Sequence, residues 1–302
     1  PDQWNFNICL FALVLSLLTR WFFTPEQKRD LYLAALTEGL LLSDSQALLP
    51  TALALPFLVA LGNPALGREI FFLLAALFCF ALAINAQLHL FESFMNGATR
   101  IRDVTATALA ALFWIVLLVK TRQFFSEWIT SISCVTLFLA GISAYFLLPA
   151  FSMANPPVNW GYPRTVEGFF HVLSRGQYGQ AEVATKLSDL LRQWFIYGNI
   201  AVDEFGAVYL AAAAIPLLFL RKMAPLNRKW FLGLFIVWLL VSELMLIHLN
   251  ISWDNSTYEL NETFFSATHF VLAILAGCGF MLAGAYYARS SKRKPRPLRG
   301  QC

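Results

Sequence analysis

Long runs of apolar residues, separated by short polar stretches, make up most of the chain. A helix needs about 20 predominantly apolar residues to cross the hydrocarbon core of a membrane, so we interpret each run as a candidate span. The pattern predicts nine helices: residues 6–23, 31–42, 47–61, 70–86, 104–119, 128–149, 200–220, 230–249 and 264–287. The expected fold class is all-α, a polytopic transmembrane helix bundle of about 8–9 spans.

The second and third of these helices are short, and polar residues and prolines interrupt them. Asp44 separates the two runs, while Pro50 and Pro56 lie within the third. Two structures fit this pattern: two brief spans, or a re-entrant pair whose helices meet at residues 43–46. Both leave the following spans in the same orientation.

Composition agrees with a membrane protein and excludes several other classes. Of the 302 residues, 58% are hydrophobic and 13% are charged, whereas soluble domains contain about 25% charged residues. This charge is too sparse to cover a soluble globule, which excludes a soluble enzyme, a disordered chain and a nucleic-acid-binding domain. The five cysteines show no CxxC or Cys/His spacing, so neither a zinc site nor a disulfide framework is expected.

Lysine and arginine set the expected orientation, because positively charged loops stay on the cytoplasmic side of a membrane. Basic residues concentrate in three connections and in the C-terminal tail: Lys28 and Arg29; Lys120 and Arg122; Arg221, Lys222, Arg228 and Lys229; and residues 289–299. We therefore place these segments in the cytoplasm. Alternation of the helices then puts four connections on the outer face: residues 43–46, 89–103, 150–199 and 250–263.

These assignments divide the chain into four parts. They are membrane helices at 1–149, an extracytoplasmic loop at 150–199, further spans at 200–288 and a basic cytoplasmic tail at 289–302. Within the loop, residues 181–197 place six apolar side chains on one helical face: Val183, Leu187, Leu190, Leu191, Trp194 and Phe195. This pattern predicts an amphipathic helix lying on the membrane surface.

The segment 155–179, NPPVNWGYPRTVEGFFHVLSRGQYG, carries the densest polar chemistry of the chain. Pro163 and Gly176 are typical of the two ends of a helix. Within that helix, four polar side chains share one face: Arg164, Glu167, His171 and Arg175. Two guanidinium groups, a carboxylate and an imidazole in a row are suited to holding a phosphate or pyrophosphate. The alternative is a surface helix with a solvated charged face, on which Trp160 and Tyr178 are interface anchors rather than a platform for a sugar.

This segment resembles the signature of the membrane-protein family catalogued as domain of unknown function 2723. That family includes bacterial members and the transmembrane-protein-260 type of eukaryotic protein O-mannosyltransferase. Three further stretches resemble the same family: residues 39–46 (GLLLSDSQ), 202–206 (VDEFG) and 264–279, with His269 inside the last. In the first stretch, Asp44 stands where the family has asparagine and Ser45 where histidine is usual.

The resemblance implies a GT-C-type fold, in which outward-facing loops transfer a sugar from a polyprenyl-phosphate donor to an acceptor protein or glycan. Arg164 and Arg175 would stabilise the departing lipid phosphate, His171 would hydrogen-bond to it, and Glu167 would orient the row. Three further residues complete the expected donor site: Asn159, Trp160 and Tyr178. Asn159 and Trp160 would contact the sugar or cap the turn.

The family's catalytic acidic loop has no counterpart in these residues, and we expect it upstream of residue 1. The chain opens at Pro1, directly before an apolar run and without a basic n-region, so we expect a longer natural protein. Asp44 is the candidate auxiliary acid within the chain. No metal and no cofactor beyond the lipid-linked sugar are expected, nor any nucleic-acid partner. The expected location is a bacterial inner membrane, or the endoplasmic reticulum if the protein is eukaryotic.

Two other function classes stay open. A transporter or lipid flippase would explain the interrupted helices and Glu243, an acidic residue in mid-span. A non-catalytic membrane scaffold would explain the missing acidic loop. For Glu243 itself, the alternatives are a proton-linked residue and an interhelical hydrogen bond, and His269 is interpreted as a packed polar residue.

Overall fold

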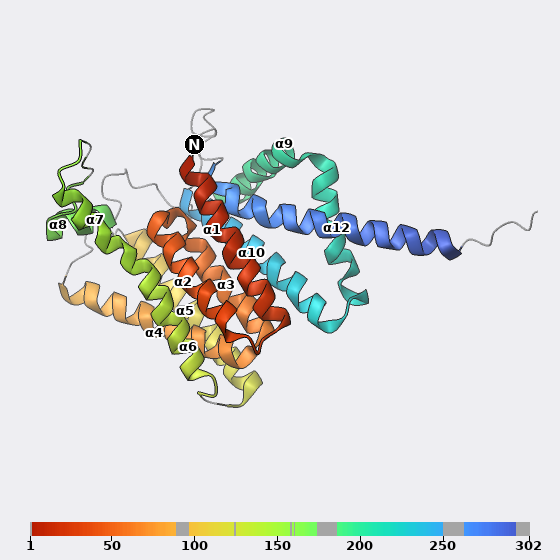
Figure 1. Cartoon of the computed structure of the whole chain (residues 1–302), viewed down its shortest axis with the longest axis horizontal. Helices are drawn as coiled ribbons and strands as arrows, with labels where there is room; N and C mark the ends of the chain where they lie inside the picture. Colours follow the sequence, from red (N-terminus) through yellow and green to blue (C-terminus); the bar gives the residue numbers. More distant parts are fainter. Residues whose placement is uncertain are drawn as a thin grey trace, which may run out of the picture.

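The computed structural model describes residues 2–88, 97–123, 125–157, 159, 161–173, 186–249 and 263–293. Every regular element in these ranges is a helix (Figure 1). The longer helices are α1 (Asp2–Phe23), α2 (Lys28–Asp44), α3 (Leu49–Gly62), α4 (Pro64–Leu88), α5 (Gly97–Thr121), α6 (Trp128–Ile142), α9 (Leu187–Phe219), α10 (Pro225–Leu249) and α12 (Ser266–Arg293). The shorter ones are α7 (Leu147–Met153), α8 (Val166–Leu173) and four 3-10 turns: η1 (Gln46–Leu48), η3 (Ser143–Phe146), η4 (Leu220–Lys222) and η5 (Thr263–Phe265).

The predicted all-α fold is confirmed over the described residues, and helices cover the nine predicted runs, four of which extend over more than one helix. Five helices are long and apolar enough to cross a membrane: Asn5–Phe23, Trp128–Met153, Leu187–Lys222, Pro225–Ile247 and Ser266–Ala288. Two shorter apolar helices are Gln46–Gly62 and Thr107–Thr121. The chain is thus an integral multi-pass membrane protein by the length and composition of these five helices.

The short helices α2 and α3 run between the two ends of the bundle rather than forming a shallow pair. At one end, Lys28 in the first turn of α2 donates to Thr130 in the first turn of α6 at 2.8 Å. At the other end, the Tyr145 hydroxyl donates to the carbonyl of Leu42 at 2.8 Å. Helix α3 begins beside this second end and finishes with Gly62 against Phe22, the penultimate residue of α1. Both helices thus extend between the two ends of the bundle, an arrangement that favours two brief spans over the re-entrant pair.

We call the end that holds Lys28, Gly62 and Trp230 the basic end, and the end that holds Gln46 and α8 the loop end. Trp230 in α10 lies 5.4 Å from the ring of Phe22 and 6.0 Å from that of Phe23. The turns after α1, α3 and α5 thus gather at the basic end, in agreement with the alternation expected from the sequence.

Backbones of α2 and α6 come into direct contact at two glycines. A Cβ atom on Gly39 would collide with the carbonyl oxygen of Phe138, and one on Gly141 with that of Leu36. Small residues allow this approach, which is a common way for membrane helices to associate. Helix α2 is thereby fixed against the span that leads to α7 and α8.

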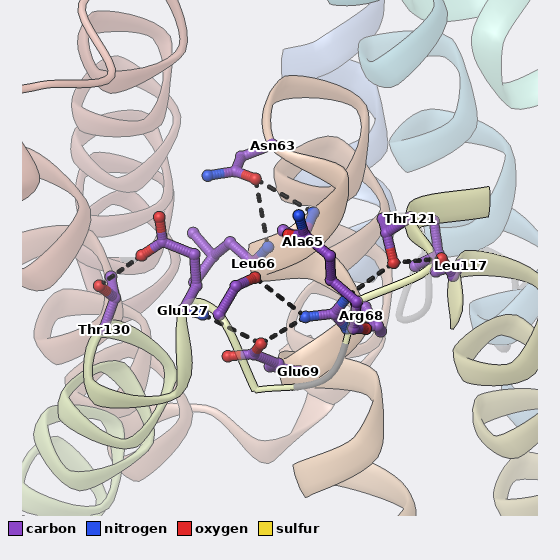
Figure 2. Close-up of polar contacts among 11 residues, drawn as sticks. Asn63, Ala65, Leu66, Arg68, Glu69, Leu117, Thr121, Glu127 and Thr130 are labelled. Carbon is purple, nitrogen blue, oxygen red and sulfur yellow. Dashed lines mark hydrogen bonds and ion pairs between the residues drawn. The ribbon is translucent and has the colours of Figure 1, made fainter. Parts of the chain in front are cut away.

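A buried network of hydrogen bonds and ion pairs around Arg68 and Glu69, which we call the seam, connects the elements at the basic end (Figure 2). Arg68, 1% exposed, donates to the Thr121 hydroxyl at 2.6 Å, to the Gln123 carbonyl, to Ser126 at 3.1 Å and to Glu69 at 2.6 Å. The backbone N–H of Glu127 donates to Glu69 at 3.0 Å, and the Glu127 carboxylate pairs with Lys28 at 3.3 Å. The seam therefore joins α2, α4, α5 and the turn before α6.

Candidate functional site

The segment between α7 and α8 is held in place by short-range hydrogen bonds. The Ser152 hydroxyl donates to the side-chain oxygen of Asn159 at 2.9 Å, and the amide nitrogen of Asn159 donates to the carbonyl of Ser152 at 3.2 Å. Gly161 has φ 72°, and a Cβ there would collide with Val172. Because only glycine adopts this conformation without strain, Gly161 sets the turn that brings the chain back onto α8.

Arg164 lies in the turn that precedes α8. Its guanidinium donates to the side-chain oxygen of Asn155 at 2.9 Å and lies over the Tyr162 ring, 5.3 Å from the centroid. The side chain of Arg164 is exposed. These two contacts orient the guanidinium while leaving it open to solvent, which suits a group that binds a phosphate.

Helix α8 carries the next two predicted residues, Glu167 and His171, both with exposed side chains. The Thr165 hydroxyl accepts the backbone N–H of Gly168 at 3.0 Å and so caps the first turn. On the opposite side, the ring of Phe169 stacks on Phe146, with centroids 5.9 Å apart. The aromatic contact holds α8 against η3, and the polar residues face away from it.

The expected row of four side chains on one helical face is only partly observed. Glu167 and His171 lie on α8, whereas Arg164 precedes the helix because the chain is still turning at Tyr162 and Thr165. Arg175, Trp160 and Tyr178 lie outside the described residues. Helix α8 begins three residues after Pro163 rather than at it.

One long-range contact joins α8 to the segment that contains Asp44. The side-chain nitrogen of Gln46 donates to the carbonyl of Leu173 at 2.9 Å. Leu173 is the last residue of α8, so Gln46 satisfies one of the carbonyls that a helix end leaves open. Asp44 ends α2 with an exposed side chain, two residues before Gln46. Two stretches 127 residues apart in sequence are thus in direct contact.

A second polar cluster connects α9, α10 and α12. The Trp194 indole donates to Glu243 at 2.7 Å, and the Tyr197 hydroxyl donates to Thr268 at 3.0 Å. Nδ1 of His269, a residue 4% exposed, contacts the carboxylate of Glu204. For Glu243, the interhelical hydrogen bond is the alternative that the structure shows, and the interpretation of His269 as a packed polar residue is confirmed.

The predicted amphipathic helix at 181–197 is helical over residues 187–197, but its end and its buried face differ from the prediction. Residues 187–205 form one helical arm of α9, which extends past residue 197 to the interruption at Gly206. The buried positions are Gln193, Ile196, Tyr197 and Ile200, which recur with helical spacing, whereas Leu187, Leu191 and Phe195 are exposed. The interruption between the two arms of α9 falls at Gly206, with φ 71° and ψ 160°.

No group of three or more His, Cys, Asp or Glu side chains arranged to hold a metal ion is found among the described residues. An apolar cleft of about 580 Å³ lies between the later parts of α9 and α12, lined among others by Phe219, Phe280 and Tyr286. The cleft is lined by none of the predicted site residues that the structure describes, namely Asp44, Asn159, Arg164, Glu167 and His171. It offers few groups that could hydrogen-bond to a sugar or a phosphate.

Comparison with known proteins found no matching family model, no matching curated protein and no matching solved structure.

Sequence reasoning missed the residues that support the predicted ones. Asn155 and Ser152 belong to or adjoin the polar segment, yet nothing in their spacing indicates that they hold Arg164 and Asn159. Gln46 lies in the stretch 39–46 that resembles the family, but its contact with α8 depends on packing across the bundle. The one local signal was the pair of glycine and proline residues at 161–163, which indicates a tight turn.

Proposed function

We propose that this chain is part of a membrane glycosyltransferase, which transfers a sugar from a polyprenyl-phosphate donor to an acceptor on the extracytoplasmic face. The donor phosphate would bind beside α8, at the loop end of the bundle. Arg164 and Arg175 are the proposed phosphate ligands, with His171 as a hydrogen-bond donor and Glu167 as the group that orients them.

The observation that carries this proposal is the hydrogen bond from Gln46 to the end of α8. The segments 39–46 and 155–179 each resemble the same family of sugar transferases, and nothing in their sequence separation requires them to meet. Their contact brings Asp44 and the exposed polar side chains of α8 to the same end of the bundle. An acid and a set of phosphate ligands on one surface are what transfer from a lipid-linked donor requires.

Chemically, the acceptor hydroxyl attacks the anomeric carbon of the donor sugar while the bond to the phosphate oxygen breaks. The hydroxyl proton passes to a carboxylate base, and negative charge grows on the departing lipid phosphate. Arginine side chains stabilise that charge through bidentate hydrogen bonds, and they do so most strongly where water is scarce. The exposure of Arg164 leaves it available for this contact.

The test replaces Arg164 and Arg175 together with alanine in the natural protein and measures transfer of labelled sugar from a polyprenyl-phosphate donor in membranes. We expect transfer to be lost while membrane insertion and expression are retained. Arg192→Ala is the matched control, since Arg192 is an exposed arginine near the start of α9 and away from α8. Unchanged transfer in the double variant would exclude the proposed phosphate site.

A transporter or lipid flippase is the second candidate, and the broken helix α9 favours it. Helix α9 is interrupted at Gly206, two residues after Glu204, whose carboxylate contacts His269 of α12. Discontinuous helices with ionisable residues beside the break are characteristic of substrate sites in transporters. Movement of a lipid-linked sugar across proteoliposomes without any glycosylated product would support this candidate over the first.

A further inference from the structure

A carboxyl group lies buried inside the bundle, away from α8. Glu38 in the middle of α2 is 5% exposed, and its partner, Thr51 in α3, is 0% exposed. The proposed function uses neither residue. The Thr51 oxygen Oγ1 lies 2.6 Å from Glu38 Oε1.

The number of hydrogens available around Thr51 constrains the protonation state of Glu38. The Thr51 oxygen also lies 2.6 Å from the carbonyl oxygen of Leu48, one turn earlier. A hydroxyl has a single hydrogen to donate, and a backbone carbonyl can only accept. If the hydroxyl donates to Leu48, the other short contact requires a hydrogen supplied by Glu38. The geometry then forms a relay in which Glu38 donates to Thr51 and Thr51 donates to Leu48.

Among the described elements that pack around Glu38, no charged side chain is placed to balance a negative charge. Helices α1 and α6 and the turns η1 and η3 pack against α2. Neither α6, η1, η3 nor α3 contains a charged residue, and those of α1, Asp2 and Arg20, lie near its two ends. The other charged residues of α2, at positions 28–30 and 44, are at its ends too. Among the described residues, no ion pair involves Glu38.

The second carboxyl oxygen gives an independent indication. Glu38 Oε2 is buried and has no hydrogen-bond partner. A carboxylate with one oxygen left unpaired in an apolar interior is strongly disfavoured, and such groups take up a proton instead. A neutral acid leaves only a carbonyl oxygen without a partner, which is far less unfavourable.

We propose that Glu38 is a proton-binding site of the bundle, occupied at neutral pH, whose hydrogen closes the relay through Thr51 to Leu48. Leu48 ends η1, the turn that begins with Gln46. The bound proton therefore holds the connection between α2 and α3 in the shape in which Gln46 reaches α8. Loss of the proton turns the Thr51 hydroxyl toward the carboxylate and releases the carbonyl of Leu48.

Infrared spectroscopy of the protein in lipid vesicles at neutral pH tests this proposal, because the C=O stretch of a protonated carboxyl is separate from the carboxylate bands. Glu38→Gln is expected to remove a protonated-carboxyl band. Glu127→Gln, which removes a carboxylate paired with Lys28 at the basic end, is expected to leave that band in place. Loss of a carboxylate band instead in Glu38→Gln would overturn the proposal.

A second pair of variants keeps the test decisive if Glu38→Gln does not fold. Thr51→Val removes the oxygen that accepts the Glu38 hydrogen, so the protonated-carboxyl band is expected to move to higher frequency. Thr51→Ser keeps the hydroxyl and is expected to leave the band where it is. An identical spectrum in the valine and serine variants would show that Glu38 does not donate to Thr51.

Discussion

The side chain of Gln46 ties the Asp44 segment to α8. It bridges elements far apart in sequence, through one hydrogen bond to a helix carbonyl. Such a bond contributes about 0.5–1.5 kcal/mol, which is small for the whole bundle and large for an eight-residue helix. The position of α8 thus depends on a residue that lies outside it.

Gln46→Ala is therefore expected to loosen α8 without unfolding the bundle. Hydrogen exchange of the backbone amides at 166–173 should become several-fold faster, since loss of about 1 kcal/mol corresponds to roughly a fivefold change in an opening equilibrium. Ser43→Ala is the control, because the Ser43 hydroxyl donates to the carbonyl of Leu40 within its own helix. Equal exchange rates in both variants would mean that Gln46 does not hold α8.

Arg68 and Glu69 form a buried ion pair, in which each charged side chain depends on the other for its stability. Arg68→Ala leaves Glu69 as an unpaired buried carboxylate, and we expect the free energy of unfolding to fall by about 3–5 kcal/mol. Replacing both residues with apolar ones of similar size, Arg68→Met with Glu69→Leu, is expected to cost much less. Thermal unfolding in detergent micelles measures both, and a double variant as unstable as Arg68→Ala would contradict the expectation.

At the scale of elements, the interruption of α9 is the feature that hydrophobic periodicity did not reveal. The spans were predictable because apolar run length determines which segments enter a membrane. The position of the break was not, since Gly206 lies in an otherwise helical sequence, and three other described glycines also have open space around them: Gly198, Gly277 and Gly284. Only the backbone conformation distinguishes Gly206 from Gly198 within α9.

This difference yields a matched pair of substitutions. Gly206→Ala should destabilise the protein by about 1–3 kcal/mol, because its φ and ψ angles lie in a region that alanine avoids. Gly198→Ala should leave stability unchanged or raise it by up to about 1 kcal/mol, since alanine favours a helix interior. Unfolding in detergent measures both changes. Equal effects at the two positions would argue that α9 is continuous.

The contact between α2 and α6 could not be predicted from the sequence either. Gly39 and Gly141 are single glycines in apolar runs, and no pattern indicates that they meet. Their closeness depends on which helices become neighbours, a property set by packing of the whole bundle. The same limit applies to the candidate site, where residue types were predictable and the supporting contacts of Asn155 and Gln46 were not.

At the scale of the whole molecule, the contacts at the two ends define a topology that can be measured. Lys28 and Trp230 belong to the basic end, whereas α8 belongs to the loop end. The distribution of lysine and arginine predicts that the basic end faces the cytoplasm. Because the two ends are separated by the length of α6 and α7, a label that cannot cross a membrane should reach only one of them.

Single cysteines at two exposed positions, Glu26→Cys and Ala154→Cys, provide this measurement in a background without other cysteines. In intact cells, a membrane-impermeant maleimide is expected to label the Ala154 position, at the end of α7. The Glu26 position, in the turn between α1 and α2, should react only after the cells are permeabilised. Labelling of both positions from the same side would contradict the proposed topology.

The seam at the basic end also has a consequence for how the protein is made. Thr121 and Ser126, which complete the bonding of Arg68, lie 53 and 58 residues further along the chain. When α4 is first made, these partners are not yet available, so the guanidinium of Arg68 lacks most of the hydrogen bonds that it has in the folded bundle. Glu69 is the next residue, so Arg68 arrives already neutralised. The adjacent pair therefore gives Arg68 a neutralising partner before the residues of α5 and of the turn before α6 have been made.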